Sequence, residues 1–118
     1  MTDALPDQVP LEVSPTEAAR ILSGGGSPPP VLLDCRTPEE HDTARIDGSV
    51  LIPMQELAAR LGELENWRDR TIVVHCHHGV RSLRVTHWLR ERGFDRATSL
   101  RGGIDAWSAE IDPSVPVY

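Results

Sequence analysis

The residues best suited to chemistry lie together in residues 75–82, which read HCHHGVRS. Cys76 follows the apolar run Thr71–Val74 and precedes a segment with helical spacing, so it lies between a buried strand and a helix start. The backbone N–H groups of such a turn, together with nearby cations, stabilise the thiolate form of a cysteine. Cys76 therefore has the position of a nucleophile, whereas Cys35, inside an apolar segment, has that of a small core residue.

Two other kinds of site use the same residue types. Histidine and cysteine ligate zinc, but four consecutive side chains point in different directions, and the recognised zinc spacings leave gaps between ligands. The sequence therefore disfavours a metal site. No second cysteine lies within four residues of Cys76, which excludes a local redox pair, although Cys35 could still meet Cys76 in space.

Composition narrows the class of protein. The chain has 118 residues, 39% of them hydrophobic and 25% charged, which is typical of one soluble globular domain. Two cysteines are too few for a disulfide framework, the sequence opens without a signal-peptide pattern, and no apolar run reaches about 20 residues. We expect a cytoplasmic protein that is a monomer or a weak dimer and does not associate with membranes.

The charge distribution points to an anionic partner. The net charge of -6 argues against general binding of nucleic acid through the whole surface. Residues 76–101 are nevertheless locally basic, because they hold six arginines against Glu91 and Asp95. An anionic substrate would suit this part of the chain.

Short apolar runs alternate with segments of helical spacing, which predicts an α/β fold with a parallel sheet. Residues 1–10 are expected to form a flexible lead-in and residues 11–118 a single domain. Trp88 and Trp107 are expected in the core. The expected strands are residues 11–13, 31–33, 49–52, 71–75 and 97–100, and the expected helices are residues 15–23, a brief helix from 38, 55–61, 82–92 and 104–111.

Parallel sheets place functional sites at the carboxyl ends of their strands. Three polar groups follow expected strands: Asp34–Arg36, His75–Cys76 and Arg101. We therefore expect them to lie along one edge of the sheet.

The spacing of Cys76 and Arg81, with four residues between them and Ser82 following, resembles the active-site loop of the rhodanese (sulfurtransferase) family. The tail, residues 111–118, is similar to that of rhodanese domains fused to enzymes that activate sulfur-carrier proteins. The chain departs from the family pattern at Cys35, where members have valine, and at residues 44–45, where many have Gly-His. Three more segments resemble family motifs in the same order: Asp34–Glu40, Ile46–Pro53 and Gly102–Trp107.

The resemblance implies a three-layer domain with a central, mostly parallel five-stranded sheet and helices on both faces. It also implies a sulfurtransferase that needs no cofactor or metal, in which Cys76 takes a sulfane sulfur from thiosulfate or a persulfide donor. The acceptor would be cyanide, a thiol or a sulfur-carrier protein. By the same resemblance Arg81 closes the loop electrostatically, Asp34 and Arg36 orient it, and the substrate is bound by His77, His78, Gly79, Val80 and Ser82.

Three alternatives remain open at this point. A rhodanese-like fold can bind partners or relay sulfur without turnover. Cysteine phosphatases and arsenate reductases are similar but keep five residues between cysteine and arginine, so they fit less well. The tail could simply pack back on the domain.

The role of His77 and His78 also stays undecided. They could bind an anion when protonated, or contribute nothing to activity.

Overall fold

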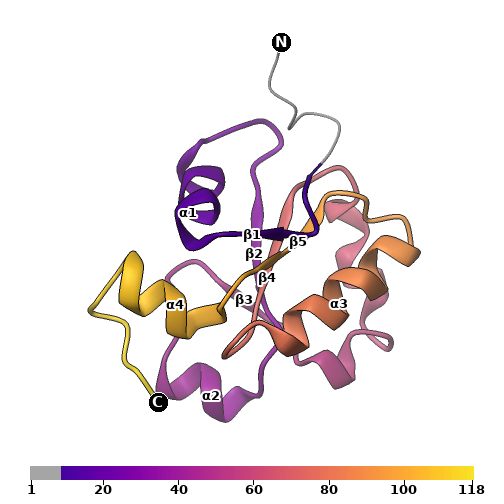
Figure 1. The fold of residues 1–118 in the computed structure, drawn as a ribbon. Coiled ribbons are helices and arrows are strands. Elements are labelled where there is room, and N and C mark those ends of the chain that lie inside the picture. Colours follow the sequence, from indigo (N-terminus) through magenta and orange to yellow (C-terminus); the bar gives the residue numbers. More distant parts are fainter. Residues whose placement is uncertain (1–8) are drawn as a thin grey trace.

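The centre of the molecule is a five-stranded sheet in a computed structural model that describes residues 9–118 (Figure 1). The strand order is β1-β5-β4-β2-β3, and every neighbouring pair is parallel. The sheet predicted as mostly parallel is therefore entirely parallel. The strands are β1 (Glu12–Val13), β2 (Val31–Asp34), β3 (Val50–Leu51), β4 (Ile72–His75) and β5 (Ala97–Leu100).

Among residues 9–118, three α-helices and two short 3-10 segments connect the strands, and a fourth α-helix follows the last strand. A capping box begins the first helix, where the Ser14 side chain accepts a hydrogen bond of 3.1 Å from the Glu17 N–H. Thr37 and Glu40 form a second capping box at the next helix. The helices are α1 (Pro15–Ser23), α2 (Pro38–Thr43), α3 (Val80–Glu91) and α4 (Gly103–Glu110), and the 3-10 segments are η1 (Met54–Glu56) and η2 (Leu61–Trp67).

The sheet is buried on both faces. Leu33 and Val74 point to one face and join a cluster with α3 and the 3-10 segments, which we call the first core cluster. Leu32 and Val73 point to the other face and pack with α1 and α4 in the second core cluster. Figure 1 shows α1 and α4 on the opposite side of the sheet from α3. Burial on both faces explains why these strands are continuously apolar rather than alternating.

The helix predicted over residues 55–61 is wrong. The chain there forms turns between η1 and η2. Of the three residues that the predicted helix would place inside, Leu57 is buried in the first core cluster and Leu61 packs against it, whereas Ala58 is exposed. Leu64, beyond the predicted helix, is also buried in this cluster. Two leucines seven residues apart fit an α-helix and a pair of 3-10 turns equally well, and Gly62 between them disfavours the α-helix.

Helix α3 begins at Val80, two residues before the predicted start at Ser82. The residue before it, Gly79, has a φ of 102°, a left-handed conformation that glycine adopts without strain. The helix ends as predicted, because Gly93 has a φ of 92° just beyond its last turn.

Helix α4 begins against the loop that follows β4. The Ile104 N–H donates to the Cys76 carbonyl at 2.9 Å, and the Asp105 N–H donates to the His77 carbonyl at 3.2 Å. Gly103, with a φ of 63°, makes this approach possible, because a Cβ there would collide with the Cys76 and His77 backbone. The Gly102–Gly103 pair thus allows the backbone of α4 to form hydrogen bonds directly with the backbone of the loop.

The predicted lead-in, residues 1–10, lies outside the described residues over residues 1–8. Val9 is buried, and its carbonyl accepts a hydrogen bond of 2.6 Å from Arg90 of α3. Within residues 9–118, no helix has the length and apolar character needed to cross a membrane.

The Gly103→Ala variant is expected to lower the free energy of unfolding by more than about 2 kcal/mol, because it adds a left-handed side chain to a backbone collision. Denaturant unfolding measures this change. Gly62→Ala is the matched control, since a Cβ at that position meets nothing within 4 Å, and it should not destabilise the protein. Equal stability of the two variants would contradict the contact between α4 and the loop.

Candidate active site

Cys76 lies at the base of the loop between β4 and α3. Its Sγ accepts hydrogen bonds from the Gly79 N–H at 3.1 Å and the Ser82 N–H at 3.3 Å. The sulfur also lies 3.4 Å from the Ser82 hydroxyl, which is hydrogen-bonded to the Ser99 hydroxyl at 2.8 Å. Two backbone N–H groups directed at one sulfur stabilise negative charge on it. The loop therefore forms a cradle for a thiolate or for an anion bonded to it.

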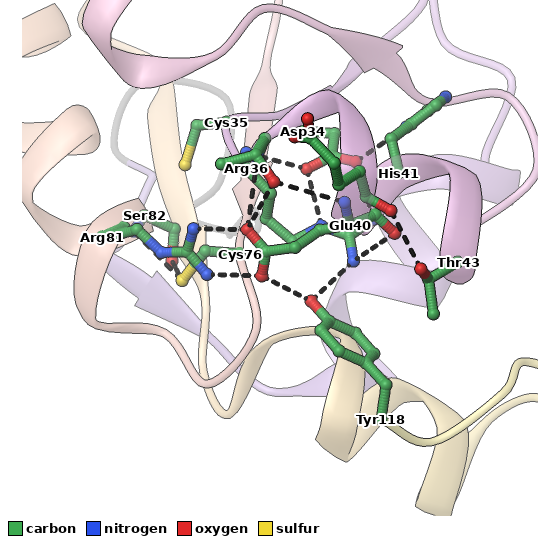
Figure 2. A network of polar contacts seen from close by, with 12 residues as sticks. Asp34, Cys35, Arg36, Glu40, His41, Thr43, Cys76, Arg81, Ser82 and Tyr118 are labelled. Carbon is green, nitrogen blue, oxygen red and sulfur yellow. Dashed lines mark hydrogen bonds and ion pairs between the residues drawn. The ribbon is translucent and has the colours of Figure 1, made fainter.

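Arg81 anchors the loop to α2. Its two terminal nitrogens donate to the two carboxylate oxygens of Glu40 at 2.7 and 2.9 Å, a bidentate pair that Figure 2 shows beside Cys76. Hydrogen bonds from Arg81 hold the pKa of Glu40 well below its usual range. The cation that the resemblance assigned to closing the loop thus binds a carboxylate from another element.

A buried ion pair lies at the end of β2. Asp34 accepts hydrogen bonds from the Arg36 side chain at 2.9 and 2.8 Å, and neither side chain is exposed to solvent. Burial alone would raise the pKa of Asp34, but the hydrogen bonds from Arg36 and His41 outweigh it, and the pKa is lowered. Arg36 also donates to the Ala44 carbonyl at 2.6 Å. This contact uses the backbone, so the departure from the family pattern at residues 44–45 does not remove it.

His75, the last residue of β4, is completely buried beside this pair. Burial lowers its pKa to about 4, so the imidazole is neutral at physiological pH. Its Nε2 lies 3.9 Å from the Asp34 carboxylate and has no hydrogen-bond partner among residues 9–118. The Asp34 carboxylate instead forms an ion pair with Arg36 and a contact of 2.8 Å with Nδ1 of His41.

Tyr118 is a site residue that the sequence analysis did not identify. Its hydroxyl accepts a hydrogen bond of 2.7 Å from Arg36 and donates one of 2.8 Å to Glu40 (Figure 2). Its ring stacks on His77 with centroids 3.9 Å apart and an angle of 8° between the planes. The only sequence signal was the tail motif, which indicated packing on the domain but no contact with the loop.

The two loop histidines stack on each other beside Asp105. His77 and His78 have ring centroids 3.9 Å apart at 19°, and the Asp105 carboxylate lies 3.9 Å from His78 Nε2. The possible metal-binding atoms of these three residues lie within 4.8 Å of one another.

The predicted substrate-binding residues fall into two groups. Gly79 and Ser82 are buried and present their N–H groups to the sulfur. Val80 and His78 have exposed side chains, with Val80 67% exposed, so Val80 can bind a substrate in the loop only through its backbone.

The free energy of unfolding is expected to fall as the pH drops from about 6.5 towards 4, by up to about 1.4 kcal/mol per pH unit. Over this range the unfolded His75 takes up a proton that the folded, buried imidazole does not accept. Denaturant unfolding at several pH values measures the slope. A His75→Asn variant should show a shallower slope, and an identical slope would show that His75 is not its cause.

Tyr118→Phe is expected to lower the free energy of unfolding by about 1 kcal/mol, because it removes two hydrogen bonds and keeps the ring stacked on His77. Tyr118→Ala should lower the free energy of unfolding further, since it also removes the ring that stacks on His77. Val117→Ala, at a 73% exposed neighbour, is the control. Thermal unfolding in which Tyr118→Phe matches the unsubstituted protein would contradict a structural role for the hydroxyl.

Comparisons with known proteins show the family to which the chain belongs. The family model described as the rhodanese-like domain matches residues 14–110. A sulfurtransferase of Allochromatium vinosum is 36% identical over 85 residues, which are 72% of this chain and 78% of that protein. The crystal structure of reduced Bacillus anthracis CoADR-RHD superposes with a TM-score of 0.75 at 31% identity, over 91% of this chain and 18% of that one.

Longer proteins also match. The probable adenylyltransferase/sulfurtransferase MoeZ of Mycobacterium tuberculosis is 38% identical over 87 residues, which are 74% of this chain but 22% of MoeZ. This chain therefore corresponds to about a fifth of that relative. The region matched by the family model, residues 14–110, contains the Cys76 loop, the Asp34–Arg36 pair and the whole of α4. The chain belongs to the rhodanese family.

Proposed function

We propose that the protein is a sulfurtransferase that carries a sulfane sulfur on Cys76 as a persulfide. The observation that supports this most is the pair of N–H groups, from Gly79 and Ser82, directed at Sγ. They stabilise the thiolate before reaction and the anionic persulfide after it. Relatives named sulfurtransferases add support for the reaction class.

The reaction proceeds in two half-reactions. In the first, the Cys76 thiolate attacks the outer sulfur of thiosulfate or of a persulfide. The sulfur–sulfur bond of the donor breaks, and sulfite or a thiolate leaves with the electron pair. In the second, a nucleophilic acceptor attacks the outer sulfur of the Cys76 persulfide and regenerates the thiolate. Cyanide, a thiol or a sulfur-carrier protein would serve as the acceptor.

The surroundings of the loop favour an anionic donor. A surface groove of about 420 Å³ adjoins the loop, and its charged lining consists of Arg84, Arg101 and Glu12, which lies 4.0 Å from Arg101. Glu40, the carboxylate nearest Arg81, is neutralised by its bidentate pair and does not repel an anion as a free carboxylate would. Cys76 itself is only 1% exposed, so a small donor or an extended chain end can reach Sγ more readily than a bulky group.

The alternatives have less support. A cysteine phosphatase needs a loop that encloses a phosphate, whereas four residues between Cys76 and Arg81 form a smaller ring. A binding module without turnover has no need for a cysteine that receives two backbone N–H groups. The match covers only 22% of MoeZ, and the family model that matches this chain is the rhodanese-like domain, so we propose only sulfur transfer for this chain.

Intact-mass spectrometry after treatment with thiosulfate tests the proposal. A Cys35→Ala variant is expected to gain the mass of one sulfur atom, and Cys76→Ala is expected to gain nothing, because only Cys76 lies in the loop cradle. Transfer of sulfur to cyanide should fall to background in Cys76→Ala. No gain of mass in Cys35→Ala from thiosulfate or from a persulfide donor would refute the transferase and favour a binding module.

A further inference from the structure

Cys35 lies opposite Cys76 on the neighbouring strand. The register of β2 and β4 pairs Leu33 with Val74 and Asp34 with His75, so the next pair is Cys35 and Cys76. The Cys35 N–H donates to the His75 carbonyl at 3.2 Å, which is the bond that continues this parallel register by one residue. Neighbouring strands are about 4.8 Å apart, within the range of roughly 4.4–6.8 Å between the Cα atoms of a disulfide.

The two side chains also point to the same face of the sheet. Leu33 and Val74 belong to the first core cluster, and so do Cys35 and Cys76, two positions further along each strand. Both cysteines are free thiols and both are 1% exposed. Cys35 is therefore enclosed in the protein with the nucleophile beside it, and Figure 2 shows both cysteines at this edge of the sheet.

Cys35 is protected from reagents in solution. Burial, with smaller effects from the charges of Cys76 and Asp34, raises the pKa of its thiol well above the usual range. The neutral S–H group points to the His75 carbonyl, 3.5 Å away. A buried, protonated thiol does not compete with Cys76 for the donor. The Cys35 thiol can therefore react only with a sulfur atom that is already bound at Cys76.

We infer that Cys35 is an internal acceptor that resolves the Cys76 persulfide and releases hydrogen sulfide; this inference rests on the proposed function. The Cys35 sulfur attacks the inner sulfur, Sγ of Cys76, after rotating away from the His75 carbonyl. A Cys35–Cys76 bond forms, and the bond to the outer sulfur breaks. The outer sulfur leaves with the electron pair and takes the proton of Cys35, which gives hydrosulfide (HS⁻), the anion of hydrogen sulfide.

The electrons of this step balance without an additional oxidant. The donated sulfane sulfur is reduced to sulfide while the two thiols are oxidised to a disulfide. A dithiol then returns both cysteines to the thiol form and completes a cycle. The activity differs from transfer to an external acceptor, because the product is free sulfide and the electrons come from the protein and then from the dithiol.

Proximity is the reason that this reaction competes with external acceptors. Two groups held side by side in a folded protein react as though one were present at a very high concentration, which offsets the low nucleophilicity of a neutral thiol. The position is also a point where this chain departs from the family pattern of valine, so the activity would distinguish it from members with that pattern.

The test compares the unsubstituted protein with Cys35→Val, which keeps an apolar side chain of similar size in the first core cluster. Both proteins are reduced, freed of reductant and given thiosulfate without a thiol acceptor. The unsubstituted protein is expected to lose the mass of two hydrogen atoms, to yield a linked pair of peptides that contain Cys35 and Cys76, and to release sulfide. Cys35→Val should keep the added sulfur and release sulfide at least about tenfold more slowly.

Two results would overturn the inference, and they differ in what they say about the proposed function. If Cys35→Val and the unsubstituted protein both gain sulfur and release it at the same rate, Cys35 is not the acceptor and the transferase stands. If Cys35→Val gains no sulfur from thiosulfate or from a persulfide donor, the transferase fails and the inference with it. Thermal unfolding checks that the variant is folded, and Cys35→Ala gives the same comparison if Cys35→Val is not.

Discussion

The parallel pairing of β2 with β4 is the interaction on which the site depends. It places Asp34 beside His75 and, one residue further, Cys35 beside Cys76. Because the carboxyl ends of parallel strands meet at one edge, Cys76, the buried ion pair and Cys35 come together without any loop having to bring them there. A shift of the register by one residue would turn Cys76 to the other face and separate it from Cys35.

A chain of charged contacts supports the loop from its outer side. Asp34 forms an ion pair with Arg36, and Glu40 forms one with Arg81. The Tyr118 hydroxyl links the two pairs, because it accepts a hydrogen bond from Arg36 and donates one to Glu40. These contacts link the end of β2, helix α2, the start of α3 and the segment that follows α4. Each of the buried charges in this network faces an opposite charge, which is the condition for keeping charges inside a protein without a large cost in stability.

Much of the fold could be predicted from local sequence patterns. The capping residue Ser14 and the end of α3 at Gly93 depend on interactions within a few residues, so the chain there carries its own signal. The prediction failed over residues 55–61, where the apolar spacing suits two kinds of helix and the choice depends on packing against the first core cluster. Tyr118 was missed because its partners, Arg36 and Glu40, are about eighty residues away in the chain.

The sequence by itself identified the family, because Cys76 and Arg81 have the spacing of its loop and four motifs occur in the family's order. Only the tertiary structure decided what those residues contact. Arg81 binds Glu40, Gly103 brings α4 against the loop, and Cys35 lies opposite Cys76. The reason is physical: motif spacing reports the geometry of one segment, whereas these contacts join segments whose relative positions are set by strand register and by burial of the core.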